Sequence, residues 1–277
     1  MSKKQETTEI DNLSSDDHGS GGEKDRSDKL SNAAYQYISS ILGESPNLFA
    51  SRALSTLDPR EIVRFAVRCM LRIRGIAERD MQWPALEKPW RATIREEFNR
   101  VLLLAGSAFE AEAEAFLKPL AKEAKAVFSA IGGRNTERMT ELDFRIQGVT
   151  VQGAFCLYYH CRLLKTGVIS QPAEWVMVRT LEVVEEAVPI ERDRRYLEAM
   201  TRAIAADLGD PGKYLQGPIM DSLWPDDVPD ELRTSIGFKL AYQARMNKPN
   251  RVPNEPLRPE SHHRPQPPEI ELKAETL

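Results

Sequence analysis

Residues 58–75 read DPREIVRFAVRCMLRIRG, and arginine recurs in this stretch at every fourth position, as Arg60, Arg64, Arg68 and Arg72. On an α-helix, with about 100° of rotation per residue, these four side chains fall on one face, within an arc of roughly 120°. The opposite arc carries the apolar residues, which are Ile62, Phe65, Ala66, Cys69, Met70, Ile73, Ile76 and Ala77. The stretch therefore predicts a helix with one apolar face toward a core and one guanidinium face.

The ends of this helix are also marked in the sequence. Asp58 is a favourable N-cap residue, and Pro59 suits the first helical position because proline has no N–H to leave unpaired there. We expect the helix to end near Asp80, before a turn at Trp83 and Pro84.

Most of the remaining chain shows the same helical period. Apolar residues at steps of three and four predict an all-α fold, a bundle-like core of about seven or eight helices. The predicted spans are 29–42, 58–80, 90–105, 107–131, 150–165, 170–187, 190–208 and 229–246. Gly106 is expected to end one helix and Ser107 with Glu110 to begin the next as a capping box. Pro119 should kink or divide that second helix.

Residues 135–167 allow two interpretations. Apolar residues alternate by four and three from Leu142 onward, which favours a helix. β-branched residues and the glycines Gly148 and Gly153 instead allow a short β element around residues 142–152. We favour helix for residues 150–165 and leave the preceding segment open.

The composition divides the chain into a tail, a core and a second tail. Residues 1–28 are polar and charged, with too little apolar surface to favour folding, so we expect a disordered tail. Residues 29–246 form the predicted helical domain, with a possible division near 132–136. Residues 247–277 form a proline-rich tail that we also expect to be disordered.

The overall charge and the cysteine content limit the functional class. A formal net charge of −4 argues against a protein that coats nucleic acid with its whole surface. The three cysteines do not form a disulfide framework, and the N-terminal sequence lacks the apolar region of a secretory signal. The longest nearly apolar stretch, residues 153–159, is far too short to cross a membrane. We therefore expect a cytoplasmic protein without a membrane segment.

Few residues in the predicted core could perform catalysis. His160 is the one histidine within it, and it lies between Cys156 and Cys161. Cys156 and His160 would share a helix face, but a structural zinc site needs four ligands and no further pair completes the set. Two small buried cysteines and one core or edge histidine are the simpler interpretation. We predict no metal site, no cofactor and no catalytic residue.

The arginine face allows three interpretations. The arginines could pair within the fold with acidic helices around Glu110–Glu114 or Glu182–Glu186, bind an acidic protein partner, or bind nucleic-acid phosphate. Residues 60–80 carry six arginines and three acids, and this net charge of about +3 is small beside the six to ten phosphate contacts of a strongly salt-dependent DNA binder. We therefore rank a protein partner above nucleic acid.

The resulting hypothesis is a non-catalytic adaptor, regulator or assembly component. Its predicted partner-binding residues are Arg60, Arg64, Arg68, Arg72 and Arg79. The alternatives are a nucleic-acid-binding regulator using the same face and an enzyme acting on a phosphorylated or nucleotide substrate. A pocket that joins Arg64 or Arg68 to two carboxylates and His160 would favour the enzyme.

Overall fold

The computed structural model describes residues 30–78, 89–111, 114–131, 139–217, 219, 223–226 and 228. Within these residues the chain forms nine helices and no strand, which confirms the all-α fold. The helices are α1 Asn32–Leu42, α2 Pro46–Leu54, α3 Pro59–Ala77, α4 Pro89–Glu110, α5 Glu114–Ile131, α6 Glu141–Cys161, α7 Thr166–Ala187, α8 Arg195–Gly209 and α9 Pro211–Tyr214.

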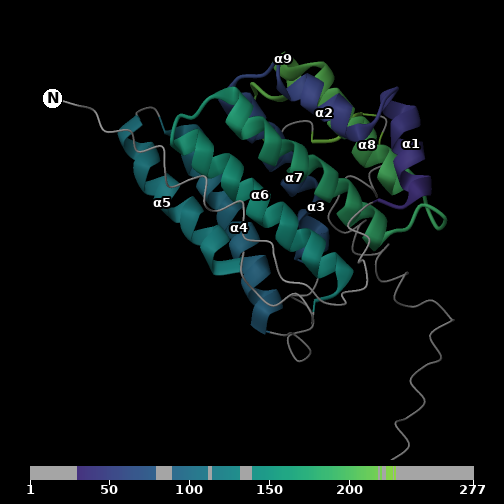
Figure 1. The fold of residues 1–277 in the computed structure, drawn as a ribbon, viewed down its shortest axis with the longest axis horizontal. Helices are drawn as coiled ribbons and strands as arrows, with labels where there is room; N and C mark the ends of the chain where they lie inside the picture. Colours follow the sequence, from purple (N-terminus) through teal and green to yellow (C-terminus); the bar gives the residue numbers. More distant parts are fainter. Residues whose placement is uncertain are drawn as a thin grey trace, which may run out of the picture.

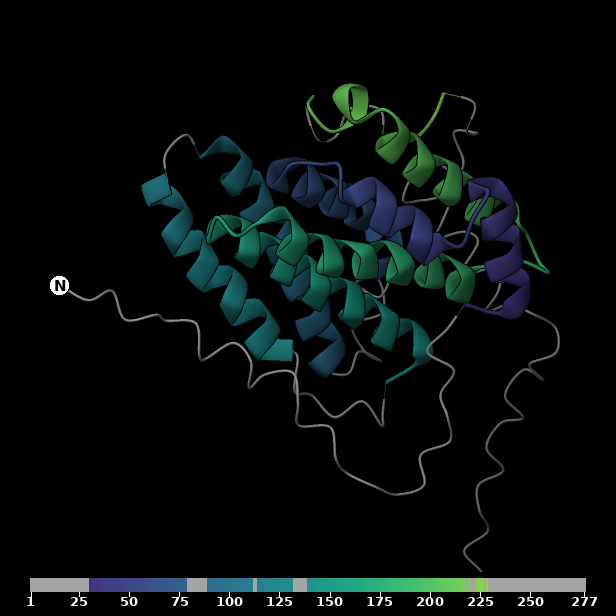
Figure 2. The ribbon, with the colours of Figure 1, turned by 45° about the horizontal axis from the view of Figure 1, so that its top comes forward.

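The helices α6 and α7 lie side by side through the middle of the molecule (Figure 1). The pair α4 and α5 lies along one side of α6, and α1, α2 and α8 gather at the other end. The arginine helix, α3, packs against both α6 and α7, and α8 with α9 forms a further layer on the outside (Figure 2). This arrangement places α3 inside the protein rather than at its edge.

The apolar arc predicted for α3 is part of one continuous core. Phe65, Met70 and Ile73 are fully buried, and they belong to the same cluster as residues of α4, α6, α7 and α8. Helices that precede residues 132–138 therefore pack directly against helices that follow them.

The ends of the first helices follow the predicted capping chemistry. The Asp58 side chain accepts hydrogen bonds from the N–H groups of Arg60 and Glu61, and Glu61 accepts one from the Asp58 N–H in return. This capping box satisfies donors that the first turn leaves open. Gly43 ends α1 with φ at +76°, as expected for a glycine in the left-handed region. The arginine helix ends at Ala77, slightly before the predicted Asp80.

The possible β element at residues 142–152 is wrong, because α6 is helical from Glu141 onward. Thr140 and Asp143 form a capping box that begins it. Gly153 is needed where α6 crosses α3, since a Cβ atom there would lie 2.5 Å from the Met70 sulfur. The glycine that weakened the helical interpretation is thus a point of close helix contact.

Two predicted helix breaks are also wrong. α4 continues through Gly106 and Ser107 to Glu110, and the Ser107 hydroxyl donates to the Leu103 carbonyl instead of capping a new helix. Pro119 lies inside α5 without dividing it. Pro119 is the sixth residue of α5, beyond its first turn, so the helix continues there with one internal hydrogen bond fewer.

The sequence analysis did not predict α2. Ser45 caps it and Pro46 takes its first position, which are the same signals that Asp58 and Pro59 give for α3. α7 begins at Thr166 rather than Ser170, and α8 begins at Arg195 rather than near Ile190. The two predicted tails and the predicted helix 229–246 lie outside the described residues.

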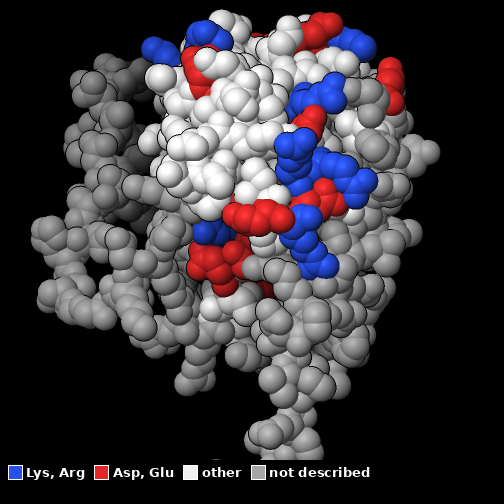
Figure 3. Space-filling model, turned by 90° about the vertical axis from the view of Figure 1, so that its right-hand side faces the viewer, with Lys and Arg blue, Asp and Glu red and all other residues white. Residues whose placement is uncertain are grey.

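The side of the molecule that carries α1 and α8 is unevenly charged. Basic and acidic side chains lie intermixed in a band, and a wide area beside the band carries neither (Figure 3). The sequence of α1, NAAYQYISSIL, contributes no charged residue to this side.

Candidate functional site

The four arginines of the row on α3 differ strongly in exposure. Arg60 is exposed and Arg64 is half-buried, whereas Arg68 and Arg72 are only 0% and 3% exposed. The row therefore runs from the protein surface into its interior. Arg79 of the predicted set lies outside the described residues.

The buried arginines share one carboxylate, Asp207 of α8, which is 1% exposed. Arg68 donates to both of its oxygens at 3.0 Å, and Arg72 approaches one of them at 2.7 Å. Separating α8 from α3 would leave buried charges without partners, which is strongly unfavourable. The two ion pairs to Asp207 therefore hold α8 against α3. Arg68 and Arg72 are buried against this carboxylate, and neither is accessible to a second protein in this fold.

The intramolecular alternative was therefore right for these two residues, but with a different acid. Glu182 of α7, one of the acids considered from the sequence, has other partners: it binds Arg145 at 2.6 Å and Arg179 at 2.8 Å, and is itself 2% exposed. Asp207 was missed. Its signal in the sequence is an isolated acid beside Ile204, Ala205, Ala206 and Leu208 of a helix that is otherwise apolar on that side.

The row also binds main-chain carbonyl groups of the chain that follows α8. Arg64 donates to the carbonyls of Leu215 at 3.0 Å and Gly217 at 2.6 Å. Arg68 donates to Ile219 at 3.1 Å, and Arg72 donates to Leu223 at 2.7 Å. Guanidinium groups thus fix an irregular segment of the chain along α3.

The outer end of the row lines a surface pocket of about 240 Å³. Its lining residues are Asp58, Arg60, Glu61, Arg64, Leu215 and Gln216. Arg60 donates to the Phe109 carbonyl at 2.7 Å, and the Arg64 guanidinium lies 5.1 Å from the centre of the Phe109 ring. Burial and the neighbouring Arg60 charge lower the pKa of Arg64.

This pocket comes close to the arrangement that would favour an enzyme. It joins Arg60 and Arg64 to two carboxylates, but His160 is not among its lining residues. Both carboxylates already accept hydrogen bonds from main-chain N–H groups at the start of α3. Burial lowers the pKa of His160, with a further lowering from Arg60 and an opposing effect of Asp58. The charges of two pocket residues, Arg60 and Asp58, therefore act on the pKa of His160.

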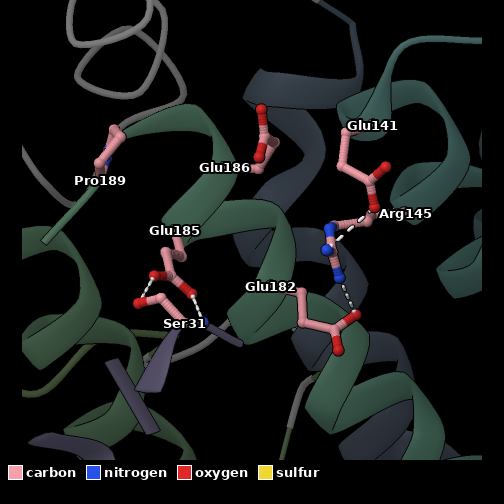
Figure 4. Close-up of a pocket in the computed structure, with 7 residues that line it drawn as sticks. All are labelled: Ser31, Glu141, Arg145, Glu182, Glu185, Glu186 and Pro189. Carbon is pink, nitrogen blue, oxygen red and sulfur yellow. Dashed lines mark hydrogen bonds and ion pairs between the residues drawn. The ribbon is translucent and has the colours of Figure 1, made fainter. Parts of the chain in front are cut away.

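A second hollow, of about 340 Å³, lies where the ends of α6 and α7 meet the start of α1 (Figure 4). Arg145 lies between Glu141 and Glu182 there, and the Ser31 hydroxyl and N–H both donate to Glu185. Burial raises the pKa of Glu182 more than the two arginines lower it. Glu182 is therefore a buried carboxylate that two arginines bind.

The cysteines and the histidine of α6 fit the simpler interpretation. Cys156 and Cys161 are buried thiols, and burial raises the pKa of Cys161 to about 11. Among the residues that the structure describes, no three His, Cys, Asp or Glu side chains gather closely enough to hold a metal ion. In the sequence GDPGK, Asp210 caps the short helix α9 by accepting from the Lys213 N–H.

The comparisons with known proteins give no further assignment. No family model, curated protein or solved structure matches this chain. Across the described helices, none is both long enough and apolar enough to span a membrane.

Proposed function

We propose that the protein is a non-catalytic helical interaction protein, an adaptor, regulator or assembly component, that binds an acidic segment of a protein partner. The binding site is the outer end of the arginine row, at Arg60 and Arg64. Arg68 and Arg72 of the predicted set are buried and stabilise the fold, so they are not part of the proposed site.

One observation carries the proposal: Arg60 and Arg64 bind protein main chain at the rim of a surface pocket. Both donate to carbonyl oxygens, and both remain at least partly exposed. Guanidinium groups bind carboxylates by the same forked geometry and more strongly, because the acceptor is then charged. The guanidinium groups of Arg60 and Arg64, which already bind carbonyl oxygens, would therefore also bind the carboxylates of an acidic peptide.

The number of exposed cations favours an acidic peptide over nucleic acid. Two of the four arginines in the row are buried, so its outer end offers two guanidinium groups. Strong phosphate-backbone binders use about six to ten contacts.

A fluorescein-labelled decaglutamate peptide tests the proposal by fluorescence anisotropy. We expect saturable binding to the wild-type chain that weakens about tenfold in the double variant Arg60→Ala/Arg64→Ala, which corresponds to about 1.4 kcal/mol. The matched control is Lys118→Ala/Lys122→Ala, which removes two exposed cations one turn apart on α5. This control should bind as the wild type does.

Equal weakening in both double variants would mean that only net charge matters, and the proposed site would be wrong. Labelled single- and double-stranded oligonucleotides are titrated in parallel. Oligonucleotide binding that depends on Arg60 and Arg64, without binding of decaglutamate, would replace the protein partner with nucleic acid.

A further inference from the structure

One face of α6 is only partly buried, and its residues follow one another at steps of three and four. Six of them are half-buried, and the seventh, the C-cap residue of α6, is exposed. We call these seven residues the outer row: Glu141, Phe144, Gly148, Val151, Phe155, Tyr158 and Arg162. This spacing places them on one side of the helix, as in the contact seam of a coiled coil. The middle of the outer row is uncharged.

Aromatic side chains extend this face onto the two neighbouring helices, α5 and α7 (Figure 1). Phe128 of α5 stacks on Phe155, with 4.4 Å between the ring centres. On α7, Trp175 is 44% exposed, and its ring lies 5.6 Å from the Arg179 guanidinium. The same guanidinium lies 5.7 Å from the Phe144 ring, so Trp175 borders the outer row. Partly exposed aromatic surface of this kind is typical of protein interfaces.

The two ends of the outer row are opposite in charge. At the Glu141 end, four glutamates and one arginine line the hollow of about 340 Å³ (Figure 4). At the other end, Arg162 and Lys165 are exposed. Two copies of the row that pack antiparallel would therefore bring each basic end to an acidic end.

The antiparallel arrangement also fits in the middle of the row. A two-fold axis that places Arg162 of one copy opposite Glu141 of the other forms the reverse pair by symmetry. Seven residues inward from each end, the same register places Phe155 opposite Gly148. Space is available at Gly148, because the atoms nearest to a Cβ there belong to the Arg179 side chain, at 3.6 Å or more. The Phe155 ring of one copy would thus pack over a residue that has no side chain.

We infer that the protein forms a symmetric dimer, in which the outer rows of two copies pack antiparallel and Arg162 of each copy binds the acidic end of the other. A second copy fits better than an unrelated partner, because one surface supplies both of the complementary charges. The row is about 30 Å long at the helical rise, a length compatible with an interface of standard size. This inference does not depend on the partner proposed for Arg60 and Arg64.

Analytical ultracentrifugation of the full-length chain tests the dimer. We expect the average mass to rise from one chain toward two between about 1 and 200 µM, a range that covers micromolar dissociation constants. Arg162→Glu and Glu141→Lys should each weaken dimerisation about tenfold or more, because each places like charges together at both ends of the dimer. The matched control is Lys213→Glu on α9, which changes the net charge as Arg162→Glu does and should dimerise as the wild type does.

An equimolar mixture of the two weakened variants tests the antiparallel register. When an Arg162→Glu copy pairs with a Glu141→Lys copy, both ends of the dimer again join opposite charges, so the mixture should dimerise about as tightly as the wild type. Glu141→Lys also removes an ion pair with Arg145. Circular dichroism and an unfolding curve establish whether this variant remains folded, and the measurements on the wild type and Arg162→Glu do not depend on it.

Three results would overturn the inference. The first is a wild-type chain that remains monomeric over the whole concentration range. The second is a dimer that Arg162→Glu leaves as tight as the control variant does. The third is a mixture of the two folded variants that dimerises no more tightly than either variant alone.

Discussion

Asp207 lies almost fully inside the protein, with its carboxylate oxygens against the guanidinium groups of Arg68 and Arg72. Arg68 and Arg72 both bind this carboxylate, and further donors of the two side chains bind main-chain carbonyls. The residue also links two helices that are far apart in the sequence. It is the position at which a single change should affect the whole fold.

We predict that Asp207→Asn lowers the free energy of unfolding by about 3 to 5 kcal/mol, the usual cost of breaking a buried ion pair from one side. Urea denaturation followed by circular dichroism measures it. Glu191→Gln removes an exposed acid and is the matched control. A loss of stability no larger than that of the control would show that Asp207 does not hold the buried arginines.

His160 should make stability depend on pH. Its folded-state pKa lies below the ordinary value of 6.5, because burial and then Arg60 disfavour the charged imidazole. The unfolded chain therefore takes up this proton first as the pH falls, and stability is lost from about pH 6.5 downward. In His160→Gln this part of the loss should disappear. Identical pH profiles of stability for wild type and variant between pH 5.5 and 7.5 would contradict this.

Among the elements, α3 and α6 show how packing affects prediction from the sequence. The arginine helix α3 was assigned correctly, with its cap, because its two faces differ in polarity. α6 remained ambiguous because it packs on α3, α4, α5 and α7, so apolar residues occur all around it. Burial on all sides removes the period from which a helix is recognised.

The contact between α3 and α6 leads to a prediction about two glycines of the same helix. Gly153→Ala should lower stability by about 1 to 3 kcal/mol, because its new methyl group meets the Met70 sulfur in a filled core. Gly148→Ala meets only the Arg179 side chain at 3.6 Å and should gain up to about 1 kcal/mol from helix propensity. Thermal unfolding of both variants compares them. Equal shifts would mean that helix propensity alone decides.

At the scale of the whole molecule, the arginine row has two parts. Its inner half, Arg68 and Arg72, ties α8 and the carbonyls of Ile219 and Leu223 to α3, and its outer half, Arg60 and Arg64, borders a surface pocket. The sequence could show that the four arginines share a helix face. It could not show where α8 covers that face. Asp207 is 139 residues from Arg68 in the sequence, and several further acceptors are main-chain carbonyls, which every residue has.

This division of the row can be tested by one series of measurements, the free energy of unfolding of the single variants Arg60→Ala, Arg64→Ala, Arg68→Ala and Arg72→Ala in urea. We predict a loss below about 1 kcal/mol for Arg60→Ala, as for an exposed charge, and an intermediate loss for Arg64→Ala. For Arg68→Ala and Arg72→Ala we predict losses of about 3 to 5 kcal/mol. Small and equal losses for all four variants would show that the whole row is a solvent-exposed face, and would contradict the account.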